Sequence, residues 1–194
     1  MTEIDIKQLG EVLEHIMHLN LPFEHCITCF SAKIMALSFI LNAQKGQFIS
    51  NEFKGRTSHI VDGLFLFLQQ RPTSAVYVIL PQLDGIVMTH LKNVGILEES
   101  QGYPIWTNKA VKHKPRTDCR NIREAILEGI ANGKSRIGKT FNVYTPELLE
   151  SLRRLRNKTL HGETIQILEN EAVDVILFLN ALHHDLELFN VTHR

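Results

Sequence analysis

Residues 151–163, "SLRRLRNKTLHGE", place four cations, an Asn, a His and a Gly within about three and a half helical turns. Histidine can take up a proton near neutral pH, and arginine can hold the non-bridging oxygens of a phosphate through its planar fork. Arg156 and His161, with four residues between them, could therefore handle a phosphodiester together. A plainer interpretation is that the basic side chains only complement the negative end of a helix.

Positive charge is concentrated in one part of the chain, although the net charge is zero. Residues 109–158 hold thirteen Lys or Arg against five Asp or Glu, and the remainder holds eight against sixteen. A cationic segment on an otherwise acidic molecule indicates an anionic partner. A solvated surface of mixed charge is the alternative.

Apolar residues recur with helical periodicity through nearly the whole chain. The pattern predicts helices at about residues 6–17, 23–43, 57–70, 75–93, 119–132, 145–162 and 170–189, with loops at 94–118 and 133–142. Pro81 either kinks one helix or divides two, and residues 75–80 could instead form a short buried strand. We predict an all-α helical bundle with additional N-terminal helices: an extension at 1–72 that packs on the bundle, and a helical domain at 73–194.

The helix at 145–162 carries the "SLRRLRNKTLHGE" stretch and has clear end signals. Thr145 is a good N-cap, Pro146 suits the first helical position, and Glu147 complements the positive end. Gly162 suits the C-terminal stop.

The N-terminal residues "MTEIDIKQLGEVLE" lack the basic and apolar regions of a secretory signal. The most apolar run, residues 26–43, carries Lys33 at its centre, so we expect a buried core helix and no membrane span. Three cysteines are an odd number and indicate no disulfide framework. The expected location is the cytoplasm.

Two further motifs suggest chemistry that their context does not favour. Residues 133–140, "GKSRIGKT", match the P-loop pattern, but a helical segment precedes them and Pro146 follows before any helix can begin. We interpret them as a basic surface loop. A group of possible zinc ligands comprises His15, His18, His25, Cys26 and Cys29. Both cysteines fall on an apolar helix, where a free Cys is commonly a small core residue, so we expect no metal and no cofactor, with zinc as the alternative.

Asn directly follows Arg156, Gly directly follows His161, and apolar helices flank the capped helix. This combination resembles the HEPN family, the higher-eukaryote and prokaryote nucleotide-binding domains, which are small α-helical bundles marked by Arg, four to six residues and His. "LPQLDGI" at residues 80–86 looks like a second family feature. The resemblance covers about residues 73–190. It implies a metal-independent endoribonuclease of a bacterial defence, abortive-infection or toxin system, which cuts RNA by attack of the 2′-hydroxyl and leaves a 2′,3′-cyclic phosphate.

The resemblance also implies roles for individual residues. Arg156, Asn157 and His161 would be catalytic. With Arg120 and Arg123 added from the basic segment at 109–158, the predicted substrate-binding set is Arg120, Arg123, Arg153, Arg154 and Lys158. The implied partners are RNA, a second copy of the chain through the face that bears Arg156 and His161, and an antitoxin or regulatory protein; no membrane is implied.

Helix geometry complicates the pairing of Arg156 with His161. Five residues correspond to about 140° on a regular helix, so the two side chains do not share a face, whereas Arg154 and His161 do. Either the last turn unwinds before Gly162, or Arg and His from two protomers meet across a two-fold axis. An inward Arg156 also needs a carboxylate partner, for which Asp84 is the candidate.

Two functions from different classes therefore stay open. The first is an RNA-cleaving homodimer. The second is a non-catalytic helical module that binds RNA, a nucleotide or a protein partner through the basic segment at 109–158. A P-loop phosphohydrolase is a distant third.

Overall fold

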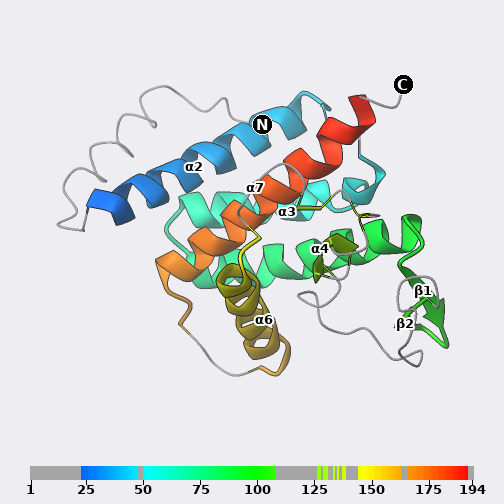
Figure 1. The fold of residues 1–194 in the computed structure, drawn as a ribbon. Helices are drawn as coiled ribbons and strands as arrows, with labels where there is room; N and C mark the ends of the chain where they lie inside the picture. Colours follow the sequence, from blue (N-terminus) through cyan, green and yellow to red (C-terminus); the bar gives the residue numbers. More distant parts are fainter. Residues whose placement is uncertain are drawn as a thin grey trace.

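The computed structural model describes residues 23–47, 50–107, 126–127, 129–130, 133, 135, 137–138, 144–162 and 166–191. The helices are α2 (Phe23–Gln44), the 3-10 helix η1 (Asn51–Phe53), α3 (Thr57–Leu68), α4 (Pro72–Asn93), α6 (Pro146–Leu160) and α7 (Glu169–Val191). A two-stranded sheet consists of β1 (Leu97–Ser100) and β2 (Tyr103–Trp106). The described chain is mostly helical, so the all-α prediction is confirmed (Figure 1).

The core forms around α7, which packs against α2, α4 and α6 (Figure 1). One cluster of buried apolar side chains includes Ile40 of α2, Ile79 of α4, Leu152 of α6 and Phe178 of α7. Burying such side chains is the main force that holds the helices together.

The packing of α3 against α4 depends on a glycine. A Cβ at Gly63 would approach Ile79 of α4 too closely, because the Cδ1 atom of Ile79 lies 3.1 Å from that position and its Cγ1 atom is closer still. Gly63 therefore allows the two backbones to approach, in spite of its low helix propensity.

Two helices, α2 and α4, are long and apolar enough to cross a membrane by length and composition alone. Core helices of soluble proteins pass the same test, and half of the α4 window is buried inside the fold. Lys33 of α2 is only 5% exposed, and its ammonium group lies 3.4 Å from the carboxylate of Glu169 at the start of α7. This ion pair fixes the middle of α2 to the beginning of α7.

Pro81 lies inside a single continuous helix, α4, on its exposed side. The alternative of a strand at 75–80 is therefore wrong, as is the division into two helices. Proline lacks an N–H group, so it removes one helical hydrogen bond, and a solvent-facing position lets water serve the carbonyl that is left.

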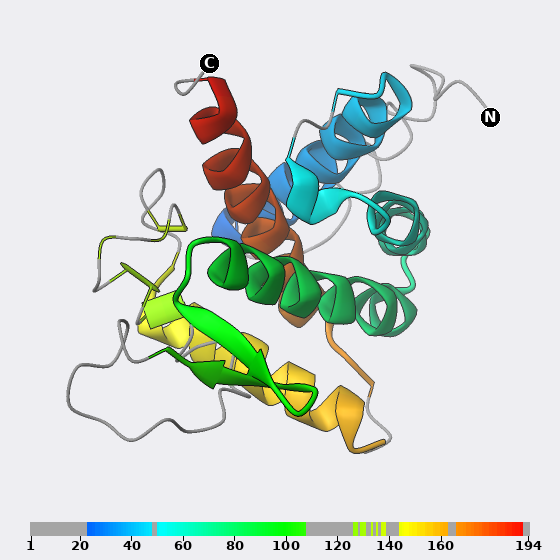
Figure 2. The same ribbon diagram turned by 90° about the vertical axis from the view of Figure 1, so that its right-hand side faces the viewer.

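The predicted loop at 94–118 is wrong for part of its length, because residues 97–106 form the β1–β2 hairpin. The turn residues Gln101 and Gly102 both have positive φ, 51° and 81°. That conformation belongs to the tight turn whose twist matches antiparallel strands. Leu97 pairs with Trp106 across the hairpin, and both side chains are buried. Strand β1 lies against α4 (Figure 2).

Several predictions fall outside the described residues. They are the helix at 6–17, most of the helix at 119–132, and the side chains of Arg120 and Arg123. Of the P-loop-like stretch, Gly133 and Gly138 are described, and both lie in turns with positive φ. The Gly138 N–H donates to the buried carboxylate of Asp185 at 2.6 Å. In a phosphate-binding loop, this amide would instead donate to the phosphate.

Candidate functional site

Helix α6 carries the motif, and its local sequence explains its bounds. The Thr145 side chain accepts a hydrogen bond from the Leu148 N–H at 3.2 Å, as predicted for an N-cap, and Pro146 opens the helix. Three leucines spaced every third residue are buried against the core: Leu149, Leu152 and Leu155. This anchoring fixes which side of α6 carries each polar side chain.

Arg156 points from α6 toward α4 and pairs with Asp84, the carboxylate that the sequence indicated as its partner. The guanidinium Nη2 lies 3.6 Å from Asp84 Oδ2, and the side chains are 22% and 25% exposed. Burial raises the pKa of the Asp84 carboxyl, and the charges of Arg156 and Arg56 partly offset that rise. Asp84 Oδ1 and Arg156 Nε are buried and have no hydrogen-bond partner.

His161 caps the C-terminal end of the same helix and is exposed. Its backbone N–H donates to the Asn157 carbonyl at 3.0 Å, which is the regular spacing of an α-helix. The chain turns only afterwards, at Gly162, where φ is +67°. The last turn therefore does not unwind before Gly162, and that route to bring His161 beside Arg156 is wrong.

Arg153 and Arg154 share a single carboxylate, that of Glu150. Arg153 contacts it through two nitrogens at 2.8 and 2.5 Å, and Arg154 Nε lies 3.3 Å from it. These hydrogen bonds, above all those of Arg153, lower the pKa of Glu150 to about 2. Both guanidinium groups are thus partly neutralised within their own helix.

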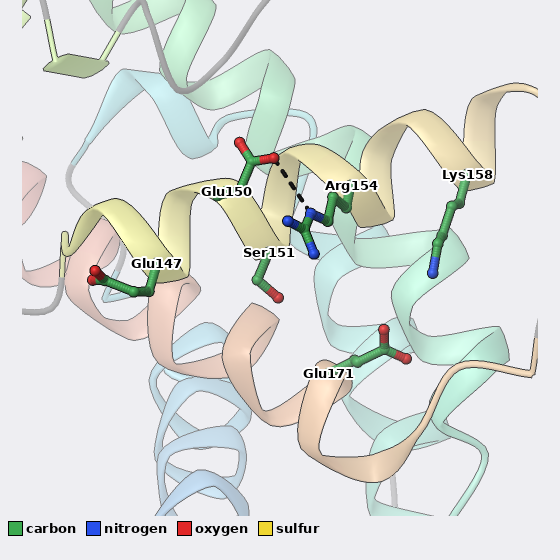
Figure 3. Close-up of a pocket in the computed structure, with 6 residues that line it drawn as sticks. All are labelled: Glu147, Glu150, Ser151, Arg154, Lys158 and Glu171. Carbon is green, nitrogen blue, oxygen red and sulfur yellow. Dashed lines mark hydrogen bonds and ion pairs between the residues drawn. The ribbon is translucent and has the colours of Figure 1, made fainter.

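A shallow groove of about 390 Å³ lies between α6 and the first turn of α7 (Figure 3). It is lined by Glu147, Glu150, Ser151, Arg154, Lys158 and Glu171. The structure thus brings Arg154 and Lys158 together here, one turn apart, while Arg156 faces α4. Three carboxylates in the same groove oppose binding of an anion, so this groove does not complete the predicted phosphate site.

The sequence indicated nothing about Arg56, which the fold brings to the Asp84–Arg156 pair. It precedes α3, and its guanidinium lies against Gly85 of α4. The available signal was Gly85 itself, directly after Asp84 in the middle of a helix where Gly is unfavourable.

A second polar constellation links η1, α4 and Ser135. His90 Nδ1 lies 3.4 Å from Glu52 Oε1, and its Nε2 lies 3.3 Å from Ser135 Oγ. These are the residue types of a Ser–His–Glu triad, but His90 and Ser135 are each only 1% exposed. The Ser135 hydroxyl also accepts from the Ile137 N–H at 3.1 Å. The network therefore stabilises the interior of the fold. The hydrogen bond between Glu52 and His90 is the main cause that lowers the pKa of Glu52 to about 2.

Metal binding has no support in the described part of the chain, where no group of three or more His, Cys, Asp or Glu could hold an ion. Cys29 is buried in the core, as expected of a small core residue, whereas His15 and His18 lie outside the described residues. No protein-family model, curated protein or solved structure matches the chain. Any function must therefore be inferred from the residues themselves.

Proposed function

We propose that the chain is a metal-independent endoribonuclease of the HEPN type that acts as a homodimer in a bacterial defence or toxin system. The observation that carries the proposal is the placement of one helix: α6 holds Arg156 against Asp84 and ends on an exposed His161 before Gly162. The helix thus holds a guanidinium in a fixed position and, on a different side, ends on a histidine that is open to solvent.

The reaction needs a base and a cation and no metal. The His161 imidazole would take the proton of an RNA 2′-hydroxyl, whose oxygen attacks the adjacent phosphorus. The bond from phosphorus to the 5′-oxygen breaks, that oxygen takes up a proton, and a 2′,3′-cyclic phosphate remains. Arg156 would hold the non-bridging oxygens as negative charge develops on them, and Asn157 would supply a further hydrogen bond.

The two key side chains must come from different subunits in this proposal. Arg156 faces α4, whereas His161 lies about 140° away around a helix that stays regular up to that residue. A two-fold axis beside α6 would place the His161 of one copy next to the Arg156 of the other, and would create two equivalent sites.

The first test is cleavage of total RNA in the presence of EDTA. The wild-type protein should cut, His161→Ala should not, and His184→Ala, which removes an exposed histidine from α7, should cut like wild type. Cleavage by the His161→Ala protein would remove His161 from the mechanism.

Mixing two inactive variants tests the composite site. A heterodimer of Arg156→Ala and His161→Ala contains one site with both residues intact if they come from different chains, and none if they come from the same chain. Subunit exchange at equal concentrations should restore about a quarter of the wild-type rate, since half of the dimers are mixed and each has one working site. Absence of any recovery, with mixed dimers shown by mass spectrometry, would refute the two-chain site.

The second candidate function is a non-catalytic module that binds RNA, a nucleotide or a protein. The observation in its favour is that Arg153, Arg154 and Arg156 all have carboxylate partners already. If the chain is such a module, RNA should bind and be recovered intact. Charge reversals at Arg120, Arg123 and Lys134 should then weaken binding more than His161→Ala does.

A further inference from the structure

We propose that Arg56 and Arg156 form a two-guanidinium subsite for a phosphate group, in which Asp84 positions Arg156 and the bare backbone at Gly85 makes room for Arg56. This inference rests on the proposed function in taking an RNA backbone phosphate as the ligand. It goes beyond that function because Arg56 belongs to the segment between η1 and α3, outside the part of the chain that resembles HEPN domains.

The position of Arg56 depends on the glycine at residue 85. A Cβ built on Gly85 would come within 2.7 Å of Arg56 Cζ and both of its Nη atoms. The guanidinium therefore occupies the space that any other side chain at this position would fill. Glycine in the interior of a helix costs about 1 kcal/mol relative to alanine, and here the absence of a side chain is what lets the guanidinium lie against α4 beside Asp84.

The charges at this place favour an anion. Two guanidinium groups outnumber one carboxylate, so positive charge is in excess, and Arg56 is close enough to Asp84 to influence its ionisation. The Arg156 side chain is 22% exposed, and Arg56 is half-buried, so both can meet a ligand at the surface while the protein shields them in part from water.

The Arg156 guanidinium has hydrogen-bonding capacity to spare. Arg156 Nη2 lies 3.6 Å from Asp84, beyond ordinary hydrogen-bond distance, and Arg156 Nε has no partner. An arginine has five N–H donors, whereas Asp84 offers only two oxygens to both residues. The two non-bridging oxygens of a phosphodiester match the planar fork of a guanidinium, which makes phosphate the fitting ligand.

Binding of an RNA that cannot be cleaved tests the subsite separately from catalysis. The probe is a fluorescein-labelled 2′-O-methyl oligoribonucleotide, which lacks the attacking hydroxyl, and the readout is fluorescence anisotropy. Arg56→Gln should raise Kd about tenfold or more, as expected for loss of hydrogen bonds to a charged group. Arg71→Gln is the matched control, because it removes the same charge from an exposed position before α4 and should change Kd less than about twofold.

Gly85→Ala is the second variant, because it keeps the charge of Arg56 and displaces its guanidinium. It should weaken binding as Arg56→Gln does, while its melting temperature stays at or above that of wild type, since alanine favours the helix. Binding by Arg56→Gln that equals wild type or Arg71→Gln would overturn the proposal. A lower melting temperature of Arg56→Gln with unchanged Kd would also overturn it and make Arg56 a purely structural clamp.

Competition with inorganic phosphate distinguishes a free phosphate from an RNA backbone as the ligand. Failure of millimolar phosphate to displace the oligonucleotide from wild type supports the backbone phosphate that we propose. Displacement that is lost in Arg56→Gln would support the two-arginine subsite but overturn its assignment to RNA. A wild-type protein that binds the probe and never cuts RNA would refute the nuclease and leave the subsite intact.

Discussion

The ion pair between Arg156 and Asp84 can be measured by a double-mutant cycle. The variants are Asp84→Asn, Arg156→Gln and the double substitution, which remove the charges with little change of shape. At 3.6 Å, Coulomb's law gives about 1.2 kcal/mol in bulk water and about 4.6 kcal/mol at the effective dielectric constant near a protein surface. Both side chains are about three-quarters buried, yet their separation of 3.6 Å is long for a hydrogen bond, so we expect a coupling energy of about 1–2 kcal/mol.

The assay is urea unfolding of the four proteins at neutral pH. The exposed pair of Lys92 and Glu99 offers a matched cycle, and water and salt should make its coupling the weaker of the two. Because burial raises the pKa of Asp84, its pair should begin to weaken at a higher pH than an ordinary aspartate would, as the carboxyl takes up a proton. A coupling energy below about 0.5 kcal/mol at neutral pH would refute the view that Asp84 holds Arg156 in position.

Two further predictions concern the scaffold. Burial lowers the pKa of His183 to about 4, so the unfolded chain binds more protons between pH 6.5 and 4, and this residue should reduce stability as the pH falls through that range. His183→Phe, which keeps a ring against Phe39 and Phe53, should lower the dependence of the melting temperature on pH in that window, and an identical dependence would contradict the assignment. Thr145→Ala removes the N-cap of α6 and should cost about 1 kcal/mol by thermal or urea unfolding, whereas Thr145→Ser should retain most of the stability.

Local signals in the sequence predicted α6 well, and long-range contacts explain what was missed. Thr145, Pro146 and Gly162 specify the ends of α6 through groups within a few residues, so the sequence alone sufficed. Asp84 could be predicted as the partner of Arg156 because an inward-facing arginine needs a carboxylate, and the "LPQLDGI" stretch contains one. The sequence did not predict the hairpin, because each strand has four residues and only one buried position. Such short strands leave no clear alternation of apolar and polar residues.

Arg56 could not be predicted from the sequence because its position depends on how α3 meets α4. Nearly thirty residues separate it from Gly85, and only the close approach of the two helices brings them together. The pairing of Arg153 and Arg154 with Glu150 lies within one helix, and its spacing of three and four residues was visible in the sequence. The count of basic residues at 109–158 nevertheless included both arginines at full charge, so it overestimated the positive charge that is available to a partner.

The sharing of Glu150 by two arginines has a consequence for any polyanion that binds α6. A guanidinium that already neutralises a carboxylate offsets less phosphate charge, so fewer condensed counterions leave the nucleic acid on association. Affinity should then vary less steeply with ionic strength than thirteen basic residues between 109 and 158 would suggest. On binding, Arg153 and Arg154 would exchange the Glu150 carboxylate for a phosphate. The net gain in binding free energy would be modest, so the complex would dissociate rapidly.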